Sequence, residues 1–148
     1  MQQSGSGQRW SADTDQVLRE AGWHPGRYVP TAEWERALQE HDEFEIHPAA
    51  QRFLAEFGGL YIPDRGAGIT MGRAEIDLNP ALARWDREIY DALRELAGVE
   101  LYPLGMTDRR NWYLGMTPTG AVYIGRDDVL LLAEDGDRAL EKIIQGIK

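Results

Sequence analysis

Apolar residues recur at helical spacing along the first part of the chain. Residues three and four apart share one face of a helix, so the pattern predicts helices that begin near Ser11, Thr31 and Pro48. The expected apolar stripes of these helices are Val17, Leu18 and Ala21; Trp34, Ala37, Leu38 and His41; and Ala50, Phe53, Leu54 and Phe57. Gly58 and Gly59 end the third helix, and we expect one of them to adopt the positive φ of a helix cap.

The middle of the chain is predicted to combine short strands with one long helix. Residues 60–62, 69–71 and 75–78 have the length and the apolar content of short strands. Asn79 and Pro80 then open a helix, because proline is favoured in a first turn. The expected buried stripe of this helix is Trp85, Ile89, Leu93 and Leu96, and Gly98 ends it.

The last third of the chain changes to the two-residue period of strands. Four strands are predicted at 101–106, 112–116, 121–124 and 129–132, followed by a helix at about 137–147. Strands this close in sequence pair antiparallel as a meander. The expected fold is therefore α+β, with N-terminal helices packed on an antiparallel meander sheet and a closing C-terminal helix.

The length of 148 residues fits one domain. Residues 1–8 are mostly Gln, Ser and Gly, which predicts a flexible tail and leaves residues 9–148 for the domain. No apolar run reaches the roughly 20 residues that cross a bilayer, and the N-terminus has no secretion signal. We therefore expect a cytoplasmic protein without a membrane partner.

The net charge of −9 bears on the choice of partner. An acidic surface repels phosphate backbones and attracts basic proteins, so we expect a protein partner and no direct contact with nucleic acid. Many cytosolic proteins are acidic for solubility alone, and charge by itself favours that explanation. The absence of cysteine excludes disulfides, thiolate metal ligands and cysteine nucleophiles.

The residues best suited to bind a metal lie around the two central histidines. His41 and His47 flank three carboxylates at positions 42, 43 and 45, all of which are ligand types. Their spacing matches no helix-face metal motif, and His47 stands where a helix cap is expected. Structural roles are therefore favoured over a metal site.

The evidence for a catalytic motif is as weak as the evidence for a metal site. The three serines, at positions 4, 6 and 11, lie near the predicted tail, where no rigid nucleophile is expected. Asp127 and Asp128 mark a turn between strands more simply than a glycosidase-like pair. We predict that the chain is not an enzyme and has no catalytic residue, no cofactor and no metal.

Two segments carry the residues best suited to contact a protein partner. The predicted loop between the second and third helices supplies four carboxylates, on Glu40, Asp42, Glu43 and Glu45. A later segment places Arg109 and Arg110 beside Trp112 and Tyr113. Strand alternation puts these two aromatic residues on opposite faces of the sheet. An exposed aromatic residue beside arginines suits an interface, and packing at the core margin explains it equally well.

Four segments in fixed order resemble one known family. They are residues 21–27 (Ala-Gly-Trp-His-Pro-Gly-Arg), 47–60 (beginning His-Pro-Ala-Ala and ending Phe-Gly-Gly-Leu), 76–80 (Ile-Asp-Leu-Asn-Pro) and 101–105 (Leu-Tyr-Pro-Leu-Gly). The set is similar to the third family of SUKH immunity proteins, and the resemblance extends from Arg9 to Gly146.

The resemblance implies a Smi/Knr-like α+β fold and a role as an antidote. Such a protein binds a cognate toxin domain, often a nuclease or a nucleic-acid deaminase of a polymorphic toxin system. The family pattern contains no catalytic residues. Two alternatives stay open: a cytosolic scaffold or regulator of the same fold without a toxin partner, and a hydrolase that uses acidic residues.

Overall fold

The computed structural model describes residues 9–148, apart from the side chains of residues 41 and 42, so the predicted tail at 1–8 lies outside it. The helices are α2 (Ala12–Ala21), α3 (Ala32–Asp42), α4 (Pro48–Phe57), the 3-10 helix η1 (Pro80–Ala83), α5 (Arg87–Ala97) and α6 (Gly136–Gln145). The strands are β1 (Tyr61–Ile62), β2 (Ile76–Asp77), β3 (Tyr102–Thr107), β4 (Trp112–Met116), β5 (Val122–Gly125) and β6 (Val129–Ala133).

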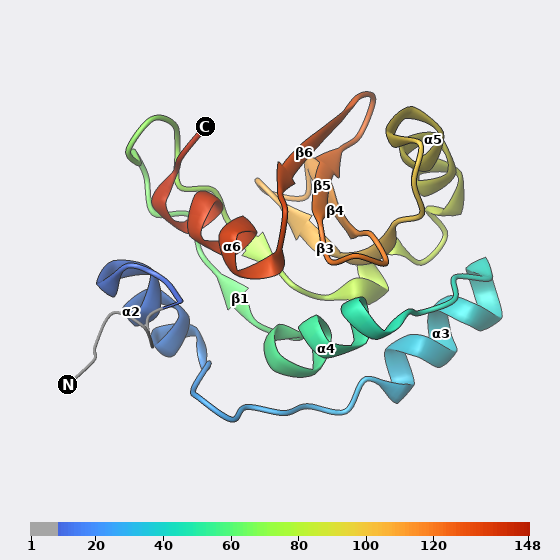
Figure 1. The fold of residues 1–148 in the computed structure, drawn as a ribbon, viewed down its shortest axis with the longest axis horizontal. Coiled ribbons are helices and arrows are strands. Elements are labelled where there is room, and N and C mark those ends of the chain that lie inside the picture. Colours follow the sequence, from blue (N-terminus) through green and yellow to red (C-terminus); the bar gives the residue numbers. More distant parts are fainter. Residues whose placement is uncertain (1–8) are drawn as a thin grey trace.

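All strands belong to one antiparallel sheet in the order β1-β2-β3-β4-β5-β6, a meander throughout. The sheet lies at the centre of the molecule, with α5 on one side and α6 on the other (Figure 1). The predicted α+β arrangement is confirmed, including the closing C-terminal helix.

The two faces of β4 are covered by different helices. On one face, the ring of Tyr90 in α5 meets the ring of Tyr113 edge-on at 5.5 Å. Gly115 leaves room on this face, because a Cβ there would lie 3.1 Å from Leu101 and 3.4 Å from the Tyr90 ring. On the other face, Met116 and Phe53 of α4 pack against Gly136 at the start of α6. Helices therefore enclose the meander from both sides.

Aromatic rings join the N-terminal segment to α4. Trp10 contacts Trp23 and Phe57 edge-on, with ring centroids 5.1 and 5.9 Å apart, and Phe53 lies 5.0 Å from Phe57. The indole nitrogen of Trp23 donates a 3.0 Å hydrogen bond to Glu56. This cluster buries the apolar stripe predicted for α4.

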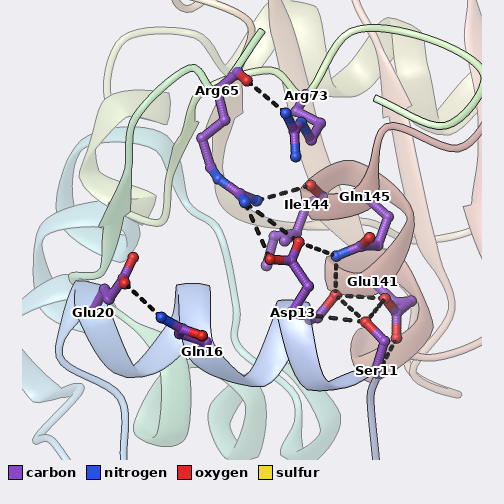
Figure 2. Close-up of polar contacts among 10 residues, drawn as sticks. Ser11, Asp13, Gln16, Glu20, Arg65, Arg73, Glu141, Ile144 and Gln145 are labelled. Atoms are coloured by element: carbon purple, nitrogen blue, oxygen red, sulfur yellow. Dashed lines mark hydrogen bonds and ion pairs between the residues drawn. The ribbon is translucent and has the colours of Figure 1, made fainter. Parts of the chain in front are cut away.

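Polar side chains fasten α2 to α6 (Figure 2). The carboxylate of Glu141 accepts hydrogen bonds from Ser11 and Thr14 at the start of α2. One turn further along α6, the amide of Gln145 donates to Asp13 and Thr14 at 2.9 and 2.8 Å. The first and last of the described helices therefore form one unit.

The long helix predicted from Asn79 to Gly98 is wrong in its first part. The chain forms η1, turns at Trp85 with a positive φ of 77°, and starts α5 only at Arg87. Trp85 is 69% exposed and Leu96 is 56% exposed, so neither belongs to the core as predicted. Apolar residues keep the helical spacing across the turn at Trp85, so the sequence pattern did not reveal this turn.

Two further predictions concern the segment around the first strands. Residues 69–71, predicted as a strand, form bends instead, and their main-chain nitrogens donate to the end of α6. Gly59 has a φ of 85°, which confirms the expected positive value after α4. Gly58 also cannot carry a side chain, because a Cβ there would lie 2.6 Å from the Trp34 ring.

Candidate protein-binding surface

An apolar trough of about 620 Å³ lies on the α6 side of the sheet. Its apolar lining comes from four parts of the chain: Met71 and Ala74; Trp112; Ile124, Val129, Leu130 and Leu132; and Ile143 and Ile147. Leu130 is 67% exposed, and Trp112 is 41% exposed. Large side chains are therefore left open to solvent on a concave surface, which is typical of an interaction site.

Strand register places the residues at the floor of the trough on one face of the sheet. Leu114, Ile124 and Leu130 are direct partners on β4, β5 and β6, so their side chains lie on the same face. Leu114 is buried, whereas Leu130 stands on the edge strand β6 and is exposed. The trough is thus the part of this sheet face that the helices leave uncovered.

One wall of the trough is fixed by the end of α6. The carbonyl of Gln145 accepts from the main-chain nitrogen of Ile69 at 2.9 Å. The carbonyl of Gly146 accepts from Thr70 and Met71 at 2.8 and 2.9 Å. Carbonyls at a helix end need such partners, so the segment that carries Met71 is held in place.

The β3–β4 hairpin forms another border of the trough and has an unusual backbone. Asp108, Arg109 and Arg110 all have positive φ, of 55°, 55° and 65°. A left-handed conformation costs roughly 1–2 kcal/mol for a residue with a side chain, so the surrounding contacts must hold this loop.

Those contacts come from the residue before β2 and from the β5–β6 turn. The nitrogen of Asp108 donates to the carbonyl of Glu75 at 2.9 Å. From the β5–β6 turn, the guanidinium of Arg126 donates to the carbonyls of Asn111 and Arg110 at 3.0 and 3.4 Å. Arg109 and Arg110 stay exposed at the tip. The hairpin is therefore a braced loop with solvent-facing side chains.

Trp112 is the residue at which the hairpin meets the trough. Its indole nitrogen donates a 3.3 Å hydrogen bond to the carboxylate of Asp108, which fixes the ring at the border. The sequence placed Trp112 among the partner-binding candidates, and the structure leaves it accessible in a hollow.

Tyr113, the other aromatic candidate, lies in the core instead. It is 4% exposed, and its hydroxyl donates to Asp86 at 2.8 Å. Burial and the hydrogen bond to Asp86 raise the pKa of Tyr113 to about 12. Its face of β4 is covered by α5, so we no longer propose Tyr113 as a contact with a partner.

The acidic segment lies on a different part of the surface. Glu40, Glu43 and Glu45 are exposed, and the side chain of Asp42 is outside the described set. Phe44 anchors the loop by contacting Tyr90 and Tyr102 in the core. Figure 1 places this loop, between α3 and α4, beside α5, whereas the trough borders α6. The structure therefore does not bring the two candidate segments together.

The histidines have structural partners where they are described. His47 caps α4 as predicted, since its Nδ1 accepts from the nitrogen of Ala50 at 3.2 Å. Its Nε2 lies 3.0 Å from the carbonyl of Met116. Among the described side chains, no group of three or more His, Asp or Glu residues could hold a metal ion.

The sequence did not reveal Met71, Leu130 and Ile143 as surface residues. The apolar run Val129–Leu132 was the available signal, because strict alternation would have placed polar residues on a solvent-facing edge strand.

Within residues 9–148, no helix is long and apolar enough to cross a membrane.

Comparison with protein families identifies the chain. The family model of the SUKH-3 immunity protein matches residues 10–146, which is nearly all of the sequence. The chain belongs to the SUKH-3 immunity protein family. The resemblance drawn from its four segments is confirmed. Comparisons with curated proteins and with solved structures gave no match.

The SUKH-3 match bears directly on the surface described above. It includes every residue that lines the trough except Ile147, and it includes the β3–β4 hairpin. An immunity protein has a toxin as its protein partner, so a surface for protein contact is expected on this domain.

Proposed function

We propose that this SUKH-3 protein neutralises a cognate bacterial toxin by binding it directly in a stoichiometric complex in the cytoplasm. The observation that carries the proposal is the family match over residues 10–146. The toxin belongs to a polymorphic toxin system and acts on nucleic acid, as a nuclease or a deaminase.

The charge of the chain supports a nucleic-acid-acting toxin. Enzymes that bind phosphate backbones carry basic clefts, and a protein with a net charge of −9 attracts such surfaces. Complementary charge raises the rate of encounter, which matters for an antidote that must reach its toxin before damage occurs.

The uncovered apolar surface supports binding as the mode of action. Interfaces draw most of their energy from a few aromatic and aliphatic side chains near their centre. Trp112 and Leu130 offer such side chains on a concave surface. A scaffold without a toxin partner could use the same surface, so the experiment has to test neutralisation itself.

The test uses the toxin domain encoded by the neighbouring gene, expressed in bacteria from an inducible promoter. Co-expression of this chain is expected to restore growth, and the two purified proteins are expected to form a complex with one binding site per chain by calorimetry. Growth arrest that persists despite folded, abundant chain contradicts the proposal. Rescue without complex formation also contradicts it, because the antidote would then act indirectly.

A further inference from the structure

We infer that the apolar trough is the toxin-binding site and that it receives large apolar side chains from a basic segment of the toxin. The inference rests on the proposed function and adds the surface and the chemistry of the contact. Its evidence is the shape of the trough, the charge of its border and the bracing of its walls.

The size of the trough suits an anchor from a partner. A volume of about 620 Å³ lies within the roughly 300–1,000 Å³ of sites that enclose small ligands, so a few side chains fit. A stable interface buries about 800 Å² on each protein, which requires the surrounding border as well. The trough therefore serves as the apolar centre, with the charged border around it.

The lining of the trough carries more acidic than basic residues, and Arg109 and Arg110 stand outside this lining at the hairpin tip. Asp64, Asp108 and Asp128 line the trough, and Lys142 is the one basic residue among the described lining residues. An apolar anchor flanked by arginine or lysine would meet complementary charge on insertion. This pattern fits the surface of an enzyme that itself binds phosphate backbones.

Two occupants from the chain itself fit less well. A second copy would bring the same three border aspartates and another net charge of −9 against this surface. The N-terminal residues 2–8 are Gln, Ser and Gly, and they have no apolar side chain to place in the hollow. The charge and the apolar lining together favour a basic foreign segment.

The walls of the trough are held by hydrogen bonds within the protein, so they are in place before a partner binds. Main-chain hydrogen bonds tie Met71 to the end of α6, and Arg126 braces the hairpin next to Trp112. A rigid site loses little conformational freedom when a partner binds, which favours a slowly dissociating complex.

The experiment measures binding of an inactivated toxin domain from the neighbouring gene by surface plasmon resonance. Trp112→Ala and Leu130→Ser are expected to raise Kd at least about 30-fold, mainly through faster dissociation, as hot-spot residues do. Trp85→Ala and Leu96→Ser are matched controls, because these residues are similarly exposed but do not line the trough. They are expected to change Kd less than about threefold.

A second set of variants tests the charge of the border. Replacing Asp64, Asp108 and Asp128 together by Asn removes three charges and keeps an acceptor for their hydrogen bonds to Gly66, Trp112 and Val129. Association is expected to slow at 0.01 M salt and to match the wild type at 1 M, where the Debye length is only about 3 Å. Circular dichroism and thermal melting establish that every variant is folded.

The outcomes separate the two proposals. A wild-type complex that is unaffected by the trough variants overturns the trough assignment and leaves the immunity function intact. If the Asn variant associates with the toxin at the wild-type rate at low salt, the inference that the partner segment is basic is overturned. A concentration-dependent dimer of the free chain that Leu130→Ser abolishes assigns the trough to a second copy. Failure of the folded wild-type chain to bind overturns both proposals.

Discussion

Glu141 on α6 caps the N-terminus of α2, with a 2.8 Å hydrogen bond from the main-chain nitrogen of Ser11 to its carboxylate. The hydroxyl of Ser11 donates to the same carboxylate at 3.0 Å and also accepts from the nitrogen of Thr14. A cap is normally supplied by the helix's own first residues. Here α6, the last of the described helices, completes the cap of α2.

We expect Glu141→Ala to lower the free energy of unfolding by about 1–2 kcal/mol, because loss of a helix cap costs roughly 0.5–2 kcal/mol. Urea denaturation measures this change, with Glu134→Ala at an exposed position as the control. Hydrogen exchange should show weaker protection in α2 than in β3. Equal stability of the two variants would mean that Ser11 alone caps α2.

Glu56 should make the protein sensitive to acid. Burial opposes ionisation of Glu56, but hydrogen bonds from Arg9 and Trp23 and the nearby guanidinium charges hold its pKa below the ordinary value of 4.5. A carboxyl with a lowered folded pKa stabilises the fold above its unfolded pKa, and this contribution is lost as the pH falls through the folded pKa.

The measurement is urea denaturation at several pH values between 7 and 3. Stability of the wild type should fall below about pH 4.5, the ordinary value for Glu56, and Glu56→Gln should show a shallower fall because it has no proton to take up. Parallel curves for the two proteins would show that Glu56 does not contribute to the acid response.

Phe57→Ala should destabilise the core. Phe57 is buried against Trp10, Trp23 and Phe53, and truncating such a residue typically costs about 3–5 kcal/mol. Leu96→Ala provides the contrast, since exposed substitutions usually stay within about 0.5 kcal/mol. Thermal melting distinguishes them, and an unchanged melting temperature for Phe57→Ala would be incompatible with this packing.

The left-handed backbone of the hairpin gives a prediction at Arg109. Its φ of 55° suits glycine better than any residue with a Cβ. Arg109→Gly should therefore be more stable than Arg109→Ala by about 1 kcal/mol, the lower end of the left-handed cost. Chemical denaturation of both variants tests this, and a more stable alanine variant would contradict the strained loop.

The acidic loop offers a prediction about the rate of toxin binding. We propose that Glu40, Asp42, Glu43 and Glu45 steer the toxin toward the chain, although the loop lies apart from the trough. Neutralising all four should slow association at 0.01 M salt and leave dissociation unchanged. Neutralising Glu20, Glu88, Glu95 and Glu134, which are exposed on α2, on α5 and before α6, controls for net charge. Equal slowing in both variants would mean that the loop has no special role.

Local patterns predicted most elements because each depended on nearby residues. Ser11, His47 and Gly59 acted as helix caps or exits, as their positions suggested. The turn at Trp85 could not be seen this way. Apolar spacing runs through it, and the separation of η1 from α5 depends on contacts such as the hydrogen bond from Tyr113 to Asp86.

The candidate surface was only partly predictable for a related reason. Alternation separated Trp112 from Tyr113, but the choice of covered face depends on where Tyr90 packs. The trough joins residues from Asp64 to Ile147, so no local window contains it. The arginines of the hairpin indicated that it is exposed, but no feature of the sequence indicated its left-handed backbone.

The braced β3–β4 hairpin has a consequence for how such an antidote can change over time. Its main chain is held by Glu75 and Arg126 through backbone carbonyls, and the side chain of Arg110 adds an ion pair to Asp77 at 3.9 Å. Mutations at these two positions alter the outer surface without removing a core contact. The tip can therefore vary in sequence while the fold that presents it is kept.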